Sequence, residues 1–357
     1  MNPASNVKLV TTAAALSMLG PEFRFKTAAY GDGHGAERGN LYLRGFGDPT
    51  LQPEDLWRIA GEVFARGVRK VNGDIVIDDS YFDDQRVGPG FEQKQSDAAY
   101  RAPQGAVSLG YNAVTVVVAP GGGDGAAARV TVEPPSPYFE IRSDARTVSR
   151  GRSSLVVEAS EAGEPGKEHM VIQVRGTIRQ AEGRQELARR VAHPDLFAGY
   201  TLRELLLRRG IKVAGKITRG AVPAQGAQLL STVYSANLGV IVRDINKRSN
   251  NFMAEQVLKT LGAEVFGRPG TWKKGLDAVA QYLGTLGIPA GRYQMQNGSG
   301  LYDANRFTAA QLVQLLRAAY RDFRYAADFV GSLAACKDEL FEVANAILNR
   351  DEVITRN

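Results

Sequence analysis

Helical sequence patterns occupy both ends of the chain and enclose a middle section rich in strand patterns. Apolar residues recur near helical spacing over residues 4–19, Gly20 ends that run, and helical runs return from residue 236 onward. Between them, β-branched runs such as residues 113–118 alternate with Gly and Pro breaks, most densely over residues 126–180. This order is expected when a domain of helices and sheet carries other domains inserted within it. We therefore predict an α/β (multi-domain α+β) fold.

The changes in pattern predict three parts. Residues 1–25 and 236–357 form a discontinuous α/β domain that opens with an amphipathic helix. Residues 26–52 and 120–235 form a β-rich inserted domain. Residues 53–119 form a small α/β inserted domain.

Composition excludes several classes of protein. With 357 residues the chain is long enough for more than one core, and no stretch approaches the roughly 20 apolar residues of a membrane-spanning helix. The net charge of +6 comes from scattered Lys and Arg, without the basic stripe and interleaved aromatics of nucleic-acid binders. No signal peptide is predicted, because the apolar run at residues 10–19 lacks a basic leader and a small-residue cleavage site.

No metal or cofactor site is predicted. Cys336 is the single cysteine, which excludes an intrachain disulfide, and the three histidines are far apart and show no ligand spacing. The glycine run at residues 121–125 lacks the order of a phosphate-binding loop. A solvated turn explains the four aspartates between residues 78 and 84 better than a metal site does.

Ser5 and Lys8 lie one helical turn apart at the start of the first helix, so their side chains share a face. A helix N-terminus lowers the proton affinity of a nearby lysine, and a neutral lysine can accept the proton of a serine hydroxyl. Ser-x-x-Lys is nevertheless expected about once by chance in a chain of this length. On this motif alone, an N-cap serine beside a surface lysine is the favoured interpretation.

A second polar element, Ser249-Asn250-Asn251, falls between two helical runs, where side chains can project into a cleft. Ser and Asn are also preferred N-cap residues. Capping and catalysis are compatible, so the position does not separate the two interpretations.

Six segments taken together resemble the D-alanyl-D-alanine carboxypeptidase/endopeptidase family, the class C low-molecular-mass penicillin-binding proteins of peptidase family S13. In chain order, from Ser5 to about Ala334, they are PASNVKLVTTAAAL, GNLYLRGFGDPTL, GDIVIDDSYFD, GYNAVTVVV, NKRSNNFMAEQVLK and NGSGLYDANRFTAAQLVQLL. The resemblance implies a β-lactamase/transpeptidase-like catalytic domain with two inserted domains.

The resemblance also implies roles. Ser5 would attack the peptide bond between two D-alanines and form an acyl-enzyme, with Lys8 as general base. Ser249 would relay a proton to the departing D-alanine, Asn251 would bind the substrate backbone, and the Ser5 N–H would supply half of an oxyanion hole. Peptidoglycan stem peptides would be the substrates, β-lactams would be acylating ligands, and the location would be periplasmic or extracytoplasmic.

The sequence departs from the family pattern in two places. A Lys-Thr-Gly motif is expected after FVGSLA, but none occurs, and FEVANAILN and RDEVI resemble the family's last strand and helix joined on after a deletion. Met1 stands almost at Ser5, as at a truncation boundary. We therefore expect an incomplete catalytic sheet. Three hypotheses stay open: a serine peptidase, a catalytically inactive module that binds peptidoglycan or protein, and a non-functional gene fragment.

Overall fold

The described residues fall into two units, each with its own core. The structure is a computed structural model and describes residues 1–94, 96–164 and 167–334. Met1–Phe25, Tyr81–Lys94 and the residues from Tyr234 onward form a helical unit, and Lys26–Ser80 with Gln95–Val233 form a β-rich unit. A mixed α/β fold is thus confirmed.

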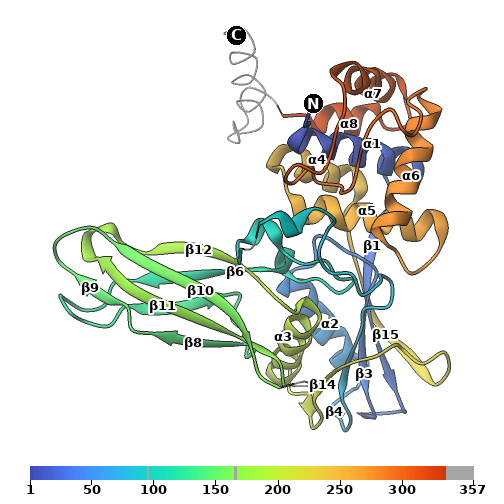
Figure 1. Cartoon of the computed structure of the whole chain (residues 1–357). Helices are drawn as coiled ribbons and strands as arrows, with labels where there is room; N and C mark the ends of the chain where they lie inside the picture. Colours follow the sequence, from blue (N-terminus) through green and yellow to red (C-terminus); the bar gives the residue numbers. More distant parts are fainter. Residues whose placement is uncertain (95, 165–166, 335–357) are drawn as a thin grey trace. The chain divides into compact units, whose positions relative to one another are not determined.

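The helical unit is built around its first helix, α1 (Val7–Leu19), which follows a short 3₁₀ turn at Ala4–Asn6. The helices that contact α1 all come from the last third of the chain (Figure 1). They are α4 (Leu238–Arg248), α5 (Asn251–Phe266), α6 (Trp272–Thr285), α7 (Ala309–Arg321) and α8 (Ala326–Ser332).

Helix α1 is buried on nearly all sides, so the prediction of an amphipathic helix was wrong. Val7, Lys8 and every residue from Val10 to Leu16 are buried, whereas Leu9 is only partly buried. Polar residues as well as apolar ones therefore face neighbouring helices. A helix surrounded in this way is the central element of its unit.

Side-chain caps fix where the surrounding helices begin. Asn237, Asn250, Thr271 and Thr308 each accept a hydrogen bond from a backbone N–H in the first turn of α4, α5, α6 and α7. Thr308 and Gln311 bond reciprocally and so form a capping box at the start of α7.

The β-rich unit contains a five-stranded sheet in the order β14-β5-β3-β1-β15. β14, β5 and β3 are parallel, and β1 is antiparallel to β3. These strands are β1 (Arg24–Asp32), β3 (Leu41–Gly45), β5 (Ile75–Asp78), β14 (Ile217–Arg219) and β15 (Ala227–Asn237). Helices α2 (Pro53–Ala65) and α3 (Pro194–Arg208) belong to the same unit, which also has a small parallel sheet of β2 (Glu37–Arg38), β4 (Lys70–Val71) and β13 (Lys212–Val213).

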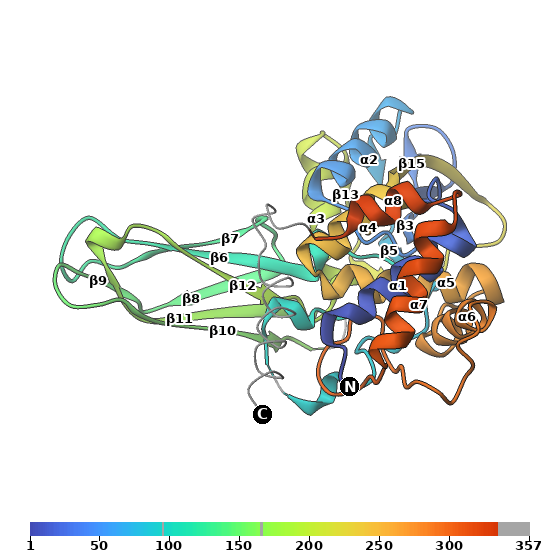
Figure 2. The ribbon, with the colours of Figure 1, turned by 90° about the horizontal axis from the view of Figure 1, so that it is seen from above.

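Two further sheets form an elongated lobe that extends away from α2 and α3 within this unit (Figures 1 and 2). β11 (His169–Arg179) pairs with β10 (Ser154–Ala162), β8 (Phe139–Ser143) and β9 (Arg146–Val148). β6 (Ala113–Ala119) lies between β7 (Arg129–Glu133) and β12 (Gln185–Arg190). Alternate side chains of β6 (Val114, Val116 and Val118) enter a core shared with α2, α3 and β11.

Segment 81–94, predicted to lie within an inserted domain, packs in the helical unit. Phe82 forms a bridge with Gly270, and the Tyr81 hydroxyl donates to Glu264 at 2.5 Å. The three-part division of the chain stays a prediction. Outside the described residues lie Cys336 and the two segments, FEVANAILN and RDEVI, that resemble the family's last strand and helix.

The predicted solvated turn is wrong for one of the four aspartates between residues 78 and 84: Asp78 is buried, whereas Asp79 and Asp83 are partly buried and Asp84 is exposed. Asp78 is 1% exposed and accepts hydrogen bonds from Ser80 and the Val222 amide. Asp83 is ion-paired with the buried Lys259 at 2.6 Å. The carboxylates of Asp78 and Asp83 thus hold loops and a helix in place, and no metal-binding group of His, Cys, Asp and Glu occurs in the part of the chain that the structure describes.

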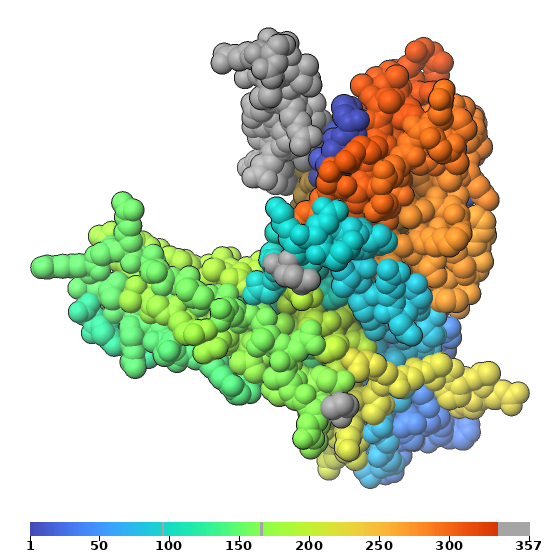
Figure 3. Space-filling model, in the orientation of Figure 1, coloured from blue at the N-terminus to red at the C-terminus, as the bar shows by residue number. Residues whose placement is uncertain are grey.

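Part of the surface of the helical unit is made by α7 and α8 (Figure 3). Tyr320 and Phe323, at and just beyond the end of α7, are exposed. Among the described helices, none combines the length and the apolar character needed to cross a membrane.

Candidate active site

The helical unit brings three side chains together. Ser5 and Lys8 lie one helical turn apart, and Ser249 is distant from both in sequence. Lys8 Nζ lies 3.1 Å from Ser5 Oγ, and the Ser249 hydroxyl donates to Ser5 Oγ at 2.9 Å. Ser5 Oγ is therefore in hydrogen-bonding contact with one amine and one hydroxyl. Such a hydroxyl has a base to receive its proton and a second group to carry a proton onward.

Local structure explains the position of Ser249. It is the C-cap of α4 in the left-handed conformation, with φ 51° and ψ 39°, and Asn250 is the residue that caps α5. The N-cap interpretation of this element is therefore confirmed at Asn250, and Ser249, one position earlier, ends α4. A left-handed non-glycine residue is sparsely populated and persists only where its surroundings fix it. Here the two helices hold the chain on both sides, and the hydroxyl faces Ser5.

Lys8 is 2% exposed, so the interpretation of a surface lysine is excluded. Burial disfavours the charged ammonium and lowers the pKa of Lys8 from about 10.5 to about 7, and the negative charge of Glu255 acts in the opposite direction. A substantial fraction of Lys8 is thus neutral near neutral pH and can accept a proton. The cause differs from the predicted helix terminus, since desolvation dominates.

The loop at residues 296–307 completes the surroundings of Lys8. Lys8 Nζ donates to the Ser299 carbonyl at 2.8 Å, and Thr11 on α1 donates to the Gly298 carbonyl at 2.8 Å. Gly300 has φ +78°, and a Cβ there would overlap the carbonyl oxygen of Ala4, next to Ser5. The loop and the serine turn therefore fit together only because residue 300 is glycine.

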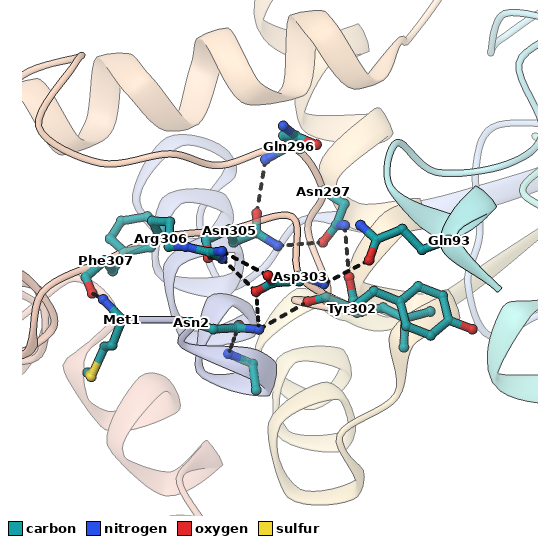
Figure 4. Close-up of polar contacts among 12 residues, drawn as sticks. Met1, Asn2, Gln93, Gln296, Asn297, Tyr302, Asp303, Asn305, Arg306 and Phe307 are labelled. Carbon is teal, nitrogen blue, oxygen red and sulfur yellow. Dashed lines mark hydrogen bonds and ion pairs between the residues drawn. The ribbon is translucent and has the colours of Figure 1, made fainter.

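Polar contacts within the loop keep its shape (Figure 4). Asn297 Oδ1 accepts from the Gly300 amide at 2.9 Å and from Asn305 Nδ2 at 3.1 Å. Asp303 is ion-paired with Arg306 and accepts from Asn2 Nδ2 at 2.9 Å.

This loop and Glu255 lie within the segments that resemble the family, but no role was predicted for them. The signal available in the sequence was the polar residues of NGSG and the glutamate of SNNFMAE, since capping accounts for Asn250. Asn251, the fourth predicted residue, is the half-buried first residue of α5 and follows Ser249 by two positions. Its role as a substrate ligand stays a prediction.

All three histidines, His34, His169 and His193, belong to the β-rich unit. Within the described helical unit, the side chain placed to act as a base toward Ser5 is Lys8.

The chain is similar to known proteins along most of its length. The model of the D-Ala-D-Ala carboxypeptidase 3 (S13) family matches residues 1–336. The D-alanyl-D-alanine carboxypeptidase of Actinomadura sp. (strain R39) is 35% identical over 324 residues, which are 88% of this chain and 59% of that protein. This chain thus spans about three-fifths of the length of that relative.

Solved structures share the fold. Penicillin-binding protein 4 (dacB) from Haemophilus influenzae superposes with a TM-score of 0.77 at 24% identity, over 92% of this chain and 72% of that one. The same protein complexed with a β-lactam gives a TM-score of 0.70 at 24% identity, over 92% and 71% of the two chains. With the family match over residues 1–336, these similarities show that the chain belongs to the D-Ala-D-Ala carboxypeptidase 3 (S13) family.

Proposed function

We propose that this chain carries the acyl-transfer centre of a serine-type D-Ala-D-Ala carboxypeptidase or endopeptidase that acts on peptidoglycan stem peptides. The observation that supports this most is the contact of Ser5 Oγ with both Lys8 Nζ and Ser249 Oγ, in a site where the pKa of Lys8 is about 7. A buried neutral amine beside a hydroxyl is the arrangement that activates a serine without histidine.

In the proposed reaction, neutral Lys8 accepts the hydroxyl proton as Ser5 Oγ attacks the carbonyl between the two D-alanines. The tetrahedral intermediate collapses when the C–N bond breaks: Ser249 gives its hydroxyl proton to the leaving amine and takes the proton held by Lys8, which is neutral again. D-Alanine departs and an ester to Ser5 remains. Water then attacks the ester while Lys8 accepts a proton from it, and that proton returns to Ser5 Oγ as the ester C–O bond breaks. The Ser5 backbone N–H would stabilise the oxyanion, and Asn251 would bind the substrate backbone.

β-Lactams would enter the same reaction, because their strained amide carbonyl can acylate Ser5 without a leaving group departing. The structure of the Haemophilus relative has been solved in complex with a β-lactam, and the Actinomadura relative is named a D-alanyl-D-alanine carboxypeptidase. Peptidoglycan substrates lie outside the cytoplasmic membrane, so we propose a periplasmic or other extracytoplasmic location.

The test is covalent labelling by a fluorescent penicillin, followed by mass spectrometry of the labelled peptide. We expect labelling at Ser5 that disappears in Ser5→Ala and persists in Ser17→Ala, a serine on α1, the helix that follows the turn of Ser5. A cooperative thermal transition in every variant ensures that lost labelling reflects lost chemistry. Labelling of a folded Ser5→Ala chain at another residue contradicts the proposed nucleophile.

The second candidate is a catalytically inactive module that binds peptidoglycan peptides or protein. It is favoured by one observation, that the 357-residue sequence contains no Lys-Thr-Gly. A folded parent chain that binds D-Ala-D-Ala peptides in equilibrium dialysis, but is never acylated, would support this candidate over the first.

A further inference from the structure

A fully buried carboxylate, Glu255, lies on α5 behind the loop that contacts Lys8. Its exposed fraction is 0%. Glu255 Oε1 accepts a hydrogen bond from the Ser299 amide at 2.8 Å, and Oε2 accepts from the Gly298 amide at 3.0 Å and from Trp272 Nε1 at 2.7 Å. Three buried N–H donors thus converge on the two oxygens of one side chain, and Glu255 gives each of them a hydrogen-bond acceptor.

The loop transmits this contact to Lys8. Glu255 accepts hydrogen bonds from the backbone amides of Gly298 and Ser299 and so fixes both. Asn297 Oδ1 fixes the Gly300 amide. That amide belongs to the same peptide group as the Ser299 carbonyl. Because the N–H and C=O of a trans peptide point in opposite directions, the Ser299 carbonyl is directed away from Asn297 and toward Lys8 Nζ. The lysine is thereby kept 3.1 Å from Ser5 Oγ.

Glu255 also acts on the charge of Lys8, since it raises the pKa that burial lowers. The other inward-facing charge on α5, Lys259, is ion-paired with Asp83. Charged side chains on α4, α6, α7 and α8 are exposed or partly buried.

We propose that Glu255 is a positioning residue for acyl transfer: it holds the Gly298–Ser299 backbone so that the Ser299 carbonyl keeps Lys8 against the nucleophile Ser5, and it supplies the negative charge behind that lysine. This proposal rests on the proposed function, because it assigns Glu255 to the same Ser5 centre.

The test variant is Glu255→Gln, which keeps the size of the side chain. The side-chain amide of glutamine has only one acceptor oxygen. At least one of the three N–H donors that surround residue 255 would therefore face its NH₂ group instead of an acceptor. The control is Glu264→Gln, the same substitution on the same helix, where the carboxylate is exposed and bonds Tyr81. Two quantities are measured in the full chain: the rate of penicillin acylation at pH 8, and the pKa of Lys8 from the ¹³Cε resonance of labelled lysine, assigned by its loss in Lys8→Arg.

We expect Glu255→Gln to slow acylation by about tenfold or more, because a catalytic group displaced by a fraction of an ångström loses much of its rate advantage. The pKa of Lys8 should fall below that in the parent chain, since burial persists while the attractive charge is lost. Glu264→Gln should stay within about twofold of the parent in rate and leave the pKa of Lys8 unchanged.

The direction of the pKa change separates positioning from a structural role. If Glu255 merely supported the fold, its loss would loosen the site, hydrate Lys8 and move its pKa up toward 10.5. An unchanged or raised pKa, or acylation as fast as in the parent, overturns the proposal. Should the parent itself resist acylation, the proposed function fails, and the titration of Lys8 still decides whether Glu255 is coupled to it.

Discussion

Lys8 combines two properties that rarely coincide in a lysine, full burial and contact with a hydroxyl. The buried ammonium is destabilised relative to the neutral amine, and so the pKa falls to about 7. In the unfolded chain the same lysine keeps its ordinary pKa. Between the two values the unfolded chain binds more protons, so the contribution of Lys8 to stability increases with pH from about 7 to 10.5.

The same titration predicts how acylation depends on pH. Only neutral Lys8 can accept the Ser5 proton, so the second-order rate constant for penicillin acylation should increase about tenfold per pH unit below pH 7. Above that pH the rate constant should level off, until another group titrates. Stopped-flow measurements from pH 5 to 9 provide the profile. A profile that is flat, or that still increases at pH 9, shows that Lys8 is not the base.

Gly300 gives a second prediction at the scale of one residue. In Gly300→Ala the new methyl group must displace the carbonyl of Ala4 and with it Ser5. We expect acylation to fall by about tenfold or more and the free energy of unfolding to fall by about 1–3 kcal/mol.

The control for Gly300→Ala is Gly291→Ala, because Gly291 also has positive φ but its Cβ would meet open space. That variant should lose only the cost of a left-handed alanine, about 1 kcal/mol, and keep its acylation rate. If acylation fell equally in the two variants, the loss would have to come from the strain of a left-handed alanine and not from displacement of Ser5.

The backbones of α5 and α6 approach each other closely. A Cβ on Gly275 of α6 would overlap the Leu258 carbonyl of α5, and a Cβ on Gly262 of α5 would overlap the Gly275 amide. A Cβ on Gly284, near the end of α6, has no neighbour within 4 Å, so the packing of the two helices depends on Gly275 and Gly262 but not on Gly284. Because α5 carries Asn251 and Glu255 at its start, the approach also sets the position of the site residues.

Gly275 and Gly284 allow a matched comparison. Gly275→Ala should destabilise the chain by about 1–3 kcal/mol, since the helices must move apart. Gly284→Ala should stabilise it by about 0.5–1 kcal/mol, because alanine loses less conformational freedom in a helix. Urea denaturation measures both changes. Equal effects of the two substitutions would contradict the inferred contact.

For individual elements, the sequence was an adequate guide. The helical runs from residue 236 onward and the β-branched run of residues 113–118 depend on near neighbours, and the structure has helices α4 and α7 and strand β6 there. The burial of Lys8 was not predictable in this way. It depends on helices from the last third of the chain that pack around α1, and no local pattern records such contacts.

At the scale of the whole molecule, long-range packing accounts for the remaining differences. Segment 81–94 was predicted to lie within an inserted domain, yet it packs with residues such as Lys259 and Asn297 of the helical unit. The contact of Ser5 with Ser249 joins positions 244 residues apart. That pairing was predicted only through the family resemblance, because spacing alone cannot specify it.

The division into two units leads to the last prediction. Ser5, Lys8, Ser249 and Glu255 all belong to the helical unit, so damage to the core of the β-rich unit should leave the acylation chemistry intact. Phe197 and Phe252 are both buried, the first in the β-rich core and the second next to Asn251 at the start of α5. Each Phe→Ala substitution should lower the free energy of unfolding by about 3–5 kcal/mol.

The two variants should differ in chemistry despite this similar loss of stability. Acylation is measured at about 15 °C, below the usual reference temperature, with circular dichroism confirming that each variant is folded. Under these conditions Phe197→Ala should be acylated at a rate within about threefold of that of the parent. Phe252→Ala should be acylated about tenfold more slowly, since the cavity lies beneath the turn that presents Ser249. A parallel loss of acylation in Phe197→Ala would mean that the β-rich unit supports the site energetically, and that the helical unit alone does not fix the geometry of Ser5.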